Sequence, residues 1–524
     1  MGRSDISRSG FAALSPVRQL LRAVDVFAGR TAVAAEGETY TYAELGERVE
    51  RLAGVLRARG VGVGDRVALV LENTPHMLEA LYACAGMEAV SVPVNFRLSE
   101  AELETIFEHS RPTVVIADPA FLATVDGALA AAEWEPTILV ADRDGYEGEL
   151  AAATPVPPRP PADEMTLLSI NYTSGTTGKP KGVMYTHRGA TLHSLGVIAE
   201  ARLGPESTYL WTLPMFHCHG WAFTWAVTAV GARHVCLRRP DPVAAWRLVE
   251  EEKVTHLCGA PTVILGLLGD PGAIEREIDV FVGGAPPSPS VLARCEALGW
   301  NVTHLYGLTE TYGPQVVCEW LPEWDELPDA ERARRKARQG VATVVSIPLR
   351  VVDENGVDVP RDGETLGEVL LTGNNVTTGY YRDPEATAAA FLDGWFRSGD
   401  LAVHHPDGYI ELRDRKKDIV ITGGENVSTI EVEAAIAEDP GVAEVAIVGV
   451  PDERWGERLH AFVVAREGEE VTLERLQEIV GASLARYKVP RGVDLVDELP
   501  KTATGKIQKF ALRERIASSG QVGR

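Results

Sequence analysis

Cysteine is scarce in this sequence. There are six cysteines in 524 residues, and no two of them form a C-x-x-C pair. This scarcity excludes a disulfide framework and a zinc ribbon, both of which need closely spaced cysteines. Residues 1–9 also lack the apolar run of a signal peptide. We therefore expect a reduced, cytoplasmic protein.

Basic residues are also few relative to acidic ones. The sequence has 51 lysines and arginines against 75 acidic residues, a net charge of −24. Such a balance repels nucleic acid and anionic membrane surfaces. Residues 213–232 carry no charged side chain, but they include Pro214 and Gly220, so we expect a buried helix there and no transmembrane segment. The sequence thus predicts no nucleic-acid partner and no stable insertion into a membrane.

Apolar and amphipathic segments alternate through the first 400 residues. Short runs rich in valine and isoleucine predict strands at 66–71, 113–117, 254–258 and 279–283, and amphipathic stretches predict helices at 74–86, 119–132, 261–268 and 291–298. This alternation is typical of largely parallel sheets covered by helices. Residues 151–163, rich in proline and alanine, read as a surface linker.

A second domain is predicted to begin near Asp414. Strands are expected at 418–422, 442–450, 459–465 and 493–499, with a helix at 473–485 and another opened by a capping box from Ser428 to Glu431. The predicted fold is therefore α/β, with a large N-terminal domain (residues 1–413) and a small mobile α+β lid domain (residues 414–524).

The sharpest local motif is YTSGTTGKPKG at residues 172–182, set between two apolar strands at 166–171 and 183–186. Glycines allow the backbone to approach an anion, while hydroxyls, amides and lysines can surround phosphate oxygens. It is no Walker A loop, because Thr173 stands at the first glycine position and Pro180 at the Ser/Thr position. The residues expected to bind phosphate are Thr173, Ser174, Gly175, Thr176, Thr177, Gly178 and Lys181.

Further motifs follow along the chain. They are PMFH (214–217), GGAP (283–286), YGLTE (306–310), WFRSGD (395–400), DRKKD (414–418), GGEN (423–426) and PKTATGK (500–506). Together and in this order they resemble the adenylate-forming superfamily of acyl-CoA synthetases, adenylation domains and luciferases. The resemblance covers essentially the whole chain and is closest to the acyl-CoA synthetase, or fatty-acid–CoA ligase, branch.

The resemblance implies a nucleotide site. Glu310 would hold Mg²⁺, together with Thr173, while Thr309 would contact the α-phosphate. Oxygen ligands suit this ion, and a metal can offset the charge of two reacting anions. The nucleoside would be bound by Tyr306, Gly307, Gly284, Ala285, Asp400 and Arg415, with Tyr306 against adenine and Asp400 on the ribose hydroxyls.

The resemblance also implies catalytic groups. Lys506 would bridge the substrate carboxylate and the α-phosphate, and His217 would gate the acid pocket or contact the carboxylate. Lys417 would lie at the hinge of the lid, with Gly423 and Gly424 approaching the acyl-adenylate beside the pantetheine tunnel after the lid turns. His219 stands where relatives often carry asparagine and is expected to tune substrate choice. Two histidines so close, with no second pair, do not favour a metal site.

The sequence therefore predicts an ATP-dependent carboxylic acid–CoA ligase that acts through an acyl-adenylate and releases AMP and pyrophosphate. ATP, Mg²⁺ and CoA are the expected cofactors and co-substrates. An alternative is an adenylating enzyme that passes the acid to a carrier protein, an amine or another small nucleophile, and a third is a non-catalytic nucleotide-binding protein. The basic run 332–338 favours a solvated helix face over a contact with CoA phosphate. The acid and the oligomeric state, a homodimer included, stay open.

Overall fold

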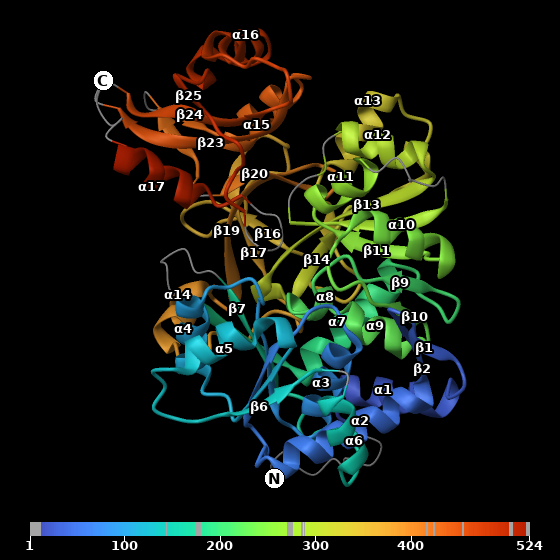
Figure 1. Ribbon diagram of the computed structural model, residues 1–524. Coiled ribbons are helices and arrows are strands. Elements are labelled where there is room, and N and C mark those ends of the chain that lie inside the picture. Colours follow the sequence, from blue (N-terminus) through green and yellow to red (C-terminus); the bar gives the residue numbers. More distant parts are fainter. Residues whose placement is uncertain are drawn as a thin grey trace, which may run out of the picture.

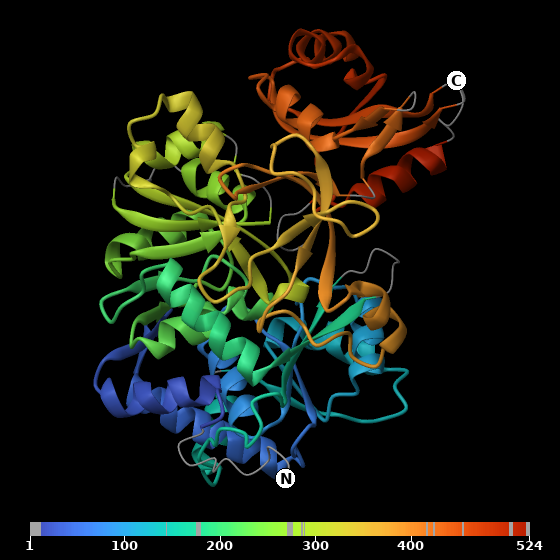
Figure 2. The same cartoon turned by 180° about the vertical axis from the view of Figure 1, so that it is seen from behind.

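The residues that the structure describes fall into three sheets and a lid (Figure 1; Figure 2). The structure is a computed structural model, and it describes residues 12–142, 144–173, 180–269, 276–284, 287, 289–415, 418–422, 425–452, 455–501 and 507–519. The roles predicted for residues outside these ranges stay predictions.

Nine strands form the largest sheet: β1 (Thr31–Ala35), β2 (Glu38–Thr41), β9 (Thr208–Leu210), β10 (Arg233–Val235), β11 (His256–Gly259), β12 (Ile278–Val282), β13 (Trp300–Leu308), β14 (Gly313–Val317) and β15 (Val341–Ala342). Their order is β15-β14-β13-β12-β11-β9-β10-β1-β2. The pairs from β13 to β1 are parallel, and antiparallel strands complete both edges.

Six strands form the second sheet: β3 (Arg66–Val70), β4 (Val90–Pro93), β5 (Val114–Ala117), β6 (Thr137–Val140), β7 (Leu167–Thr173) and β8 (Lys181–Thr186). They lie in the order β6-β5-β3-β4-β7-β8, and all pairs are parallel except the hairpin β7–β8. Strand β5 (VVIA) is buried along its whole length, which is typical of a parallel strand covered on both faces.

Helices fill the space between these sheets and cover their outer faces. Those in the shared core are α1 (Pro16–Val26), α2 (Tyr42–Ala58), α3 (Pro75–Gly86), α7 (His187–Glu200) and α9 (Phe223–Ala229). Those around the outside are α4 (Glu100–Ser110), α5 (Leu122–Leu129), α6 (Gly145–Ala152), α10 (Pro242–Glu251), α11 (Pro261–Gly269), α12 (Pro289–Ala297), α13 (Asp329–Lys336) and α14 (Pro384–Ala390). A separate core joins α10, α11 and α12 to the nine-stranded sheet.

The third sheet is antiparallel and leads to the lid. It consists of β16 (Arg350–Val352), β17 (Leu366–Leu371), β18 (Phe391–Leu392), β19 (Trp395–His404) and β20 (Ile410–Arg415). The lid contains β21 (Val420–Thr422), β22 (Glu425–Val427), β23 (Val442–Asp452), β24 (Gly456–Ala465), β25 (Gly492–Leu495), α15 (Thr429–Ala437), α16 (Leu473–Ser483) and α17 (Lys509–Ser519). One face of its sheet packs on α15 and α16 and the other on α17.

The predicted α/β fold with a small C-terminal domain is confirmed. Strand β20 runs through the predicted boundary at 413/414, and the exact division into domains stays a prediction. None of the helices in the described part of the chain has the length and hydropathy needed to cross a bilayer. All six cysteines are buried and unpaired.

The prediction of one buried helix at 213–232 needs correction. The stretch is buried, but its regular helix, α9, begins only at Phe223. The segment before it, α8 (Cys218–Trp221), is a left-handed turn: φ is positive at five successive residues, from 51° at Cys218 to 62° at Ala222. Such a turn costs roughly 1–2 kcal/mol for each residue other than glycine, so tertiary contacts must hold it.

Candidate active site

A broad cleft of about 2820 Å³ opens between the N-terminal domain and the lid. Its wall includes all the described residues that were predicted to bind nucleotide or metal or to act in catalysis. These are Thr173, Lys181, His217, Gly284, Tyr306, Gly307, Thr309, Glu310, Asp400 and Arg415. Motifs from distant parts of the sequence thus meet around one space, as a single active site requires.

The predicted phosphate loop joins β7 to β8. Thr173 and Lys181 are directly opposed in this hairpin, so both ends of the loop face the cleft. The Lys181 ammonium lies 4.8 Å from the centre of the Tyr380 ring. Ser174, Gly175, Thr176, Thr177 and Gly178 lie outside the described residues. The structure therefore places the two residues at the base of the loop, including Lys181, whose positive charge is expected to bind phosphate.

Glu310 lies in a short 3₁₀ turn, η2 (Thr309–Thr311), between β13 and β14. Its Oε1 atom accepts a hydrogen bond of 2.9 Å from the Tyr380 hydroxyl, and its carbonyl accepts one of 2.7 Å from the amide of Thr377. Burial, and secondarily Glu310, raises the pKa of Tyr380, so this phenol stays a donor. The Thr309 carbonyl accepts a hydrogen bond of 2.7 Å from the Tyr185 hydroxyl. The turn that would meet the nucleotide is thus fixed by two tyrosines.

This arrangement suits a metal ion that arrives with its nucleotide. The described residues contain no cluster of three acidic, histidine or cysteine side chains that could hold a metal alone. Mg²⁺ commonly takes one or two carboxylates plus substrate phosphates and water. Glu310 supplies one such carboxylate at the cleft wall, where an ion bound to triphosphate can reach it.

Asp400 accepts hydrogen bonds from two directions. Its Oδ2 atom accepts a hydrogen bond of 2.7 Å from the Tyr306 hydroxyl, and its Oδ1 atom lies 3.0 Å from Nε of Arg415. Asp400 and Arg415 are cross-strand partners on β19 and β20, and the Ser398 hydroxyl accepts the Asp400 amide at 3.0 Å. Burial and, to a lesser extent, the negative charge of Asp400 raise the pKa of the Tyr306 hydroxyl. These contacts hold the carboxylate at the cleft wall with lone pairs left for further donors such as ribose hydroxyls.

The segment that contains His217, predicted to gate the acid pocket, is held in place by side chains from other elements. Two buried asparagines hold this segment. Asn73 donates hydrogen bonds to the carbonyls of Trp211 and Leu213 (3.0 and 3.1 Å) and accepts one from the Met215 amide (2.8 Å). Asn171 donates a hydrogen bond to the Phe216 carbonyl (2.8 Å). His217 itself lines the cleft. Sequence analysis missed both asparagines, although Asn73 follows directly after a predicted parallel strand, where ligand sites form.

Trp221 closes this part of the cleft. Its side chain lies so close to two glycines that a Cβ atom on Gly283 would come within 2.8 Å of Cη2, and one on Gly313 within 3.1 Å of Cδ1. Trp221 is 6% exposed. The indole therefore fills the space between β12, β14 and the left-handed turn. His219, predicted to tune substrate choice, points into the core and does not line the cleft.

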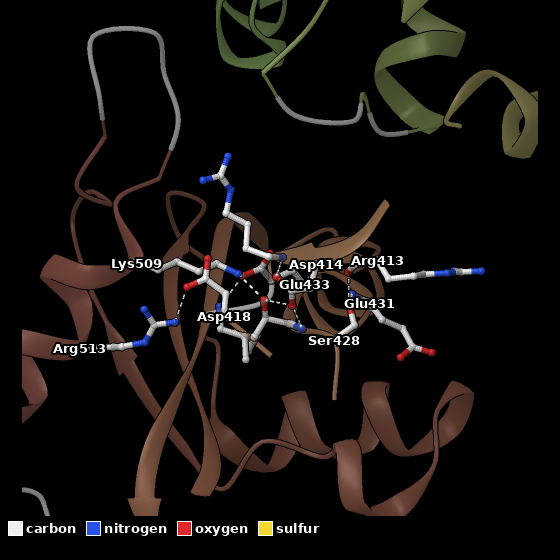
Figure 3. Close-up of polar contacts among 11 residues, drawn as sticks. Arg413, Asp414, Asp418, Ser428, Glu431, Glu433, Lys509 and Arg513 are labelled. Carbon is white, nitrogen blue, oxygen red and sulfur yellow. Dashed lines mark hydrogen bonds and ion pairs between the residues drawn. The ribbon is translucent and has the colours of Figure 1, made fainter. Parts of the chain in front are cut away.

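The lid is attached through polar contacts around β20 and α15 (Figure 3). The Asp414 carboxylate accepts hydrogen bonds from the amide and the hydroxyl of Thr429, the first residue of α15. Lys509 bridges Glu433 (2.8 Å) and the Thr429 hydroxyl, so α17 is tied to the same point. Ser428 accepts the Glu431 amide, as the predicted capping box requires, but the Glu431 side chain pairs with Lys488.

Several predicted residues cannot be placed. Lys506, Lys417, Gly423, Gly424 and Ala285 lie outside the described residues. The segment that contains Lys506 is bracketed by Lys501 and Ile507, which pair as an isolated antiparallel bridge, and both line the cleft. Most of the basic run lies in α13, where Arg335 makes the predicted i,i+4 pair with Glu331, and Arg334 and Arg338 line the cleft.

Comparison with known proteins agrees with this geometry. The family model of the AMP-binding enzymes matches residues 20–381, and the model of the AMP-binding enzyme C-terminal domain matches residues 431–506. The chain belongs to the AMP-binding enzyme family. The predicted membership of the adenylate-forming superfamily is thereby confirmed.

Individual AMP-binding enzymes are similar along nearly the whole chain. A 4-hydroxybutyrate–CoA ligase of Metallosphaera sedula is 41% identical over 530 residues, covering 97% of this chain and 96% of that protein. A peroxisomal acetate/butyrate–CoA ligase of Arabidopsis thaliana is 38% identical over 551 residues, covering 98% and 97%. The structure of ATP-bound MatB from Rhodopseudomonas palustris matches with a TM-score of 0.85 and 30% identity, covering 95% and 99%.

Proposed function

We propose that this enzyme joins a short carboxylic acid to CoA through an acyl-adenylate. The coarser activity, ATP-dependent acid–CoA ligation, is confirmed, because relatives at about 40% identity over almost the whole chain are CoA ligases. Transfer to a carrier protein or an amine, the alternative considered from the sequence, is not favoured. The chain length of the acid is the new element.

The observation that carries the proposal is the position of Trp221. His217 and Trp221 both line the cleft, and the indole fills the gap beside Gly283 and Gly313. We take the indole as the end of the acid pocket, so that an acid of a few carbons would fit in front of it and a longer chain would meet it. The relatives named for 4-hydroxybutyrate and for acetate and butyrate support the same range.

The described residues can perform the first half-reaction as follows. Asp400, held by Tyr306 and Arg415, would bind the ribose, and Thr173 and Lys181 would bind the phosphates. These contacts would align the acid carboxylate with the α-phosphorus, which converts a bimolecular attack into a positioned one. Carboxylate oxygen would bond to phosphorus, and pyrophosphate would leave. Mg²⁺ on Glu310 would neutralise phosphate charge when bound.

In the second half-reaction the sulfur of CoA would attack the acyl carbonyl and AMP would leave. The described part of the chain offers no thiol suited to a covalent intermediate, because all six cysteines are buried and burial raises the pKa of Cys218, for example, to about 12. The adenylate itself is therefore the activated species. The predicted roles of Lys506, Lys417, Gly423 and Gly424 belong to the same proposal.

The test is pyrophosphate release from MgATP with acetate, butyrate, 4-hydroxybutyrate, hexanoate, octanoate and benzoate, each with and without CoA, with products identified by mass spectrometry. We expect release with the two- to four-carbon acids and conversion to thioesters when CoA is present. A preference for octanoate or benzoate would contradict the short-acid proposal. Adenylate that accumulates unchanged in the presence of CoA would contradict the CoA acceptor.

Three further features remain proposals of the same kind. Mg²⁺ is the expected metal, a homodimer is one possible assembly, and the cytoplasm is the expected compartment. Six unpaired thiols agree with a reducing compartment, which the cytoplasm provides. Dialysis against a chelator followed by addition of Mg²⁺, Mn²⁺ or Ca²⁺ tests the metal, and light scattering tests the assembly.

A further inference from the structure

The left-handed turn at residues 218–222 is held by a chain of buried hydrogen bonds. Trp225 donates from Nε1 to the Tyr312 hydroxyl at 2.8 Å, and this hydroxyl contacts Nδ1 of His219. His219 Nε2 lies 3.0 Å from the Ser169 hydroxyl, which donates 2.9 Å to the Ser91 carbonyl. The chain thus runs from α9 through the turn to the six-stranded sheet.

The direction of the bonds in this chain follows from the number of hydrogens and from the charge of His219. The indole of Trp225 can only donate, so the Tyr312 oxygen accepts from it. The single hydroxyl hydrogen of Ser169 goes to Ser91, so Ser169 accepts from His219 Nε2. Burial lowers the pKa of His219 to about 3 and favours the neutral imidazole, so Nδ1 carries no hydrogen and accepts from the Tyr312 hydroxyl.

His219 is thus fixed on both sides at the centre of the strained turn. Its carbonyl is held as well, since the Thr224 hydroxyl donates to it at 3.0 Å. Backbone in this region is strained and persists only where surrounding contacts over-determine it. Two residues further on, the same turn presents Trp221 to the acid pocket.

We propose that His219 is a positioning residue that sets the chain length of the acid: it holds the left-handed turn, and the turn holds the Trp221 indole against Gly283 and Gly313. His219 does not touch the acid in this arrangement. Tyr312 acts with it, because its ring also stacks on Tyr185 at 3.9 Å between ring centres. The inference rests on the proposed function, since it explains how the short pocket is maintained.

The variants His219→Gln and Tyr312→Phe each break the chain. A glutamine amide can still donate to Ser169 but leaves the tyrosine hydroxyl without its acceptor, and phenylalanine removes the hydroxyl. We expect the ratio of kcat/KM for butyrate over octanoate in pyrophosphate release to fall at least tenfold in both, while KM for ATP stays within twofold of the parent. His187→Gln is the matched control, because His187 is also fully buried and pairs with Ser15 at 2.9 Å, outside the chain of hydrogen bonds that holds the turn.

The control should lose stability and keep the ratio. Folded variants of His219 and Tyr312 with an unchanged ratio would overturn the proposal. Nitrogen-15 NMR of histidine-labelled protein tests it independently: the imidazole signal that His219→Gln removes should, in the parent, carry its hydrogen on Nε2 and not titrate between pH 5 and 8, and the opposite tautomer would overturn the chain. A parent enzyme that prefers octanoate would contradict the short-acid proposal alone, because the shift between parent and variant is read separately.

Discussion

Asp400 shows how a single site residue depends on its neighbours. Tyr306 and Arg415 each bind one of its oxygens, and they come from different segments of the cleft wall. An isolated carboxylate at this position would be free to rotate and to take up a proton or a cation. Held between the two, it presents its remaining lone pairs to the cleft in one orientation.

We expect Asp400→Asn to raise KM for ATP roughly 10- to 100-fold. The reason is that hydrogen bonds to a charged group contribute about 1.5–3 kcal/mol, and an amide cannot accept with both of its polar atoms. Substrate-saturation curves measure the effect. Asp358→Asn, which removes an exposed partner of Arg350, should leave KM unchanged, and an equal change in both variants would contradict the role of Asp400.

Glu310→Gln should lower kcat for pyrophosphate release roughly 10²-fold, the usual effect of removing a group that stabilises developing charge. It should also raise the Mg²⁺ concentration needed for half-maximal rate, which a Mg²⁺ titration at saturating ATP measures. Glu438→Gln changes another acid on the cleft wall and serves as control. An unchanged Mg²⁺ requirement would show that Glu310 acts without the metal.

At the residue scale, sequence motifs predicted the cleft wall well and its supports poorly. Glu310 and Asp400 lie within short, continuous motifs whose chemistry can be read locally. The partner of Glu310 is Tyr380, seventy positions away, and only the pairing of distant strands brings the two together. No periodicity or spacing indicates such a contact, and the same holds for Tyr185 and Thr309.

Among the elements, the left-handed turn has the clearest consequence. Trp221→Ala should deepen the acid pocket by removing the indole and shift preference from butyrate toward hexanoate and octanoate. Loss of a buried tryptophan should also cost about 3–5 kcal/mol of stability. A panel of acids measures the first effect and urea unfolding the second. Trp246→Ala, which empties a core far from the cleft, should cost stability and keep the acid preference.

Most elements were predictable from local pattern, and this turn was not. The strands β3, β5, β11 and β12 match apolar runs in the sequence, and α3, α11 and α12 match amphipathic ones. The stretch 213–232 carries no Asp, Glu, Lys or Arg, so it predicts burial but not conformation. Its backbone is decided by tertiary contacts, such as that of Gly220, where a Cβ atom would come within 2.2 Å of the Trp211 ring.

The molecule as a whole should be sensitive to mild acid. Burial lowers the pKa of His187, His193 and His304 to about 4, and of His219 and His234 to about 3. The unfolded chain takes up protons near the ordinary value of about 6.5, whereas the folded protein does not. The free energy of unfolding should therefore fall as the pH drops from about 6.5 toward 4. Urea midpoints at pH 7.5, 6.5 and 5.5 measure this, and a flat profile would contradict it.

The parallel pairing of β1 with β10 has a consequence during synthesis. Val33 lies beside His234, so the first strand of the chain completes its place in the sheet only after some 200 further residues have been made. At about 5–20 residues per second a ribosome needs roughly 10–40 s for that length. Throughout this interval the edge of β1 that will pair with β10 has no neighbour, and the nascent chain is a natural client for a chaperone that covers unpaired strands.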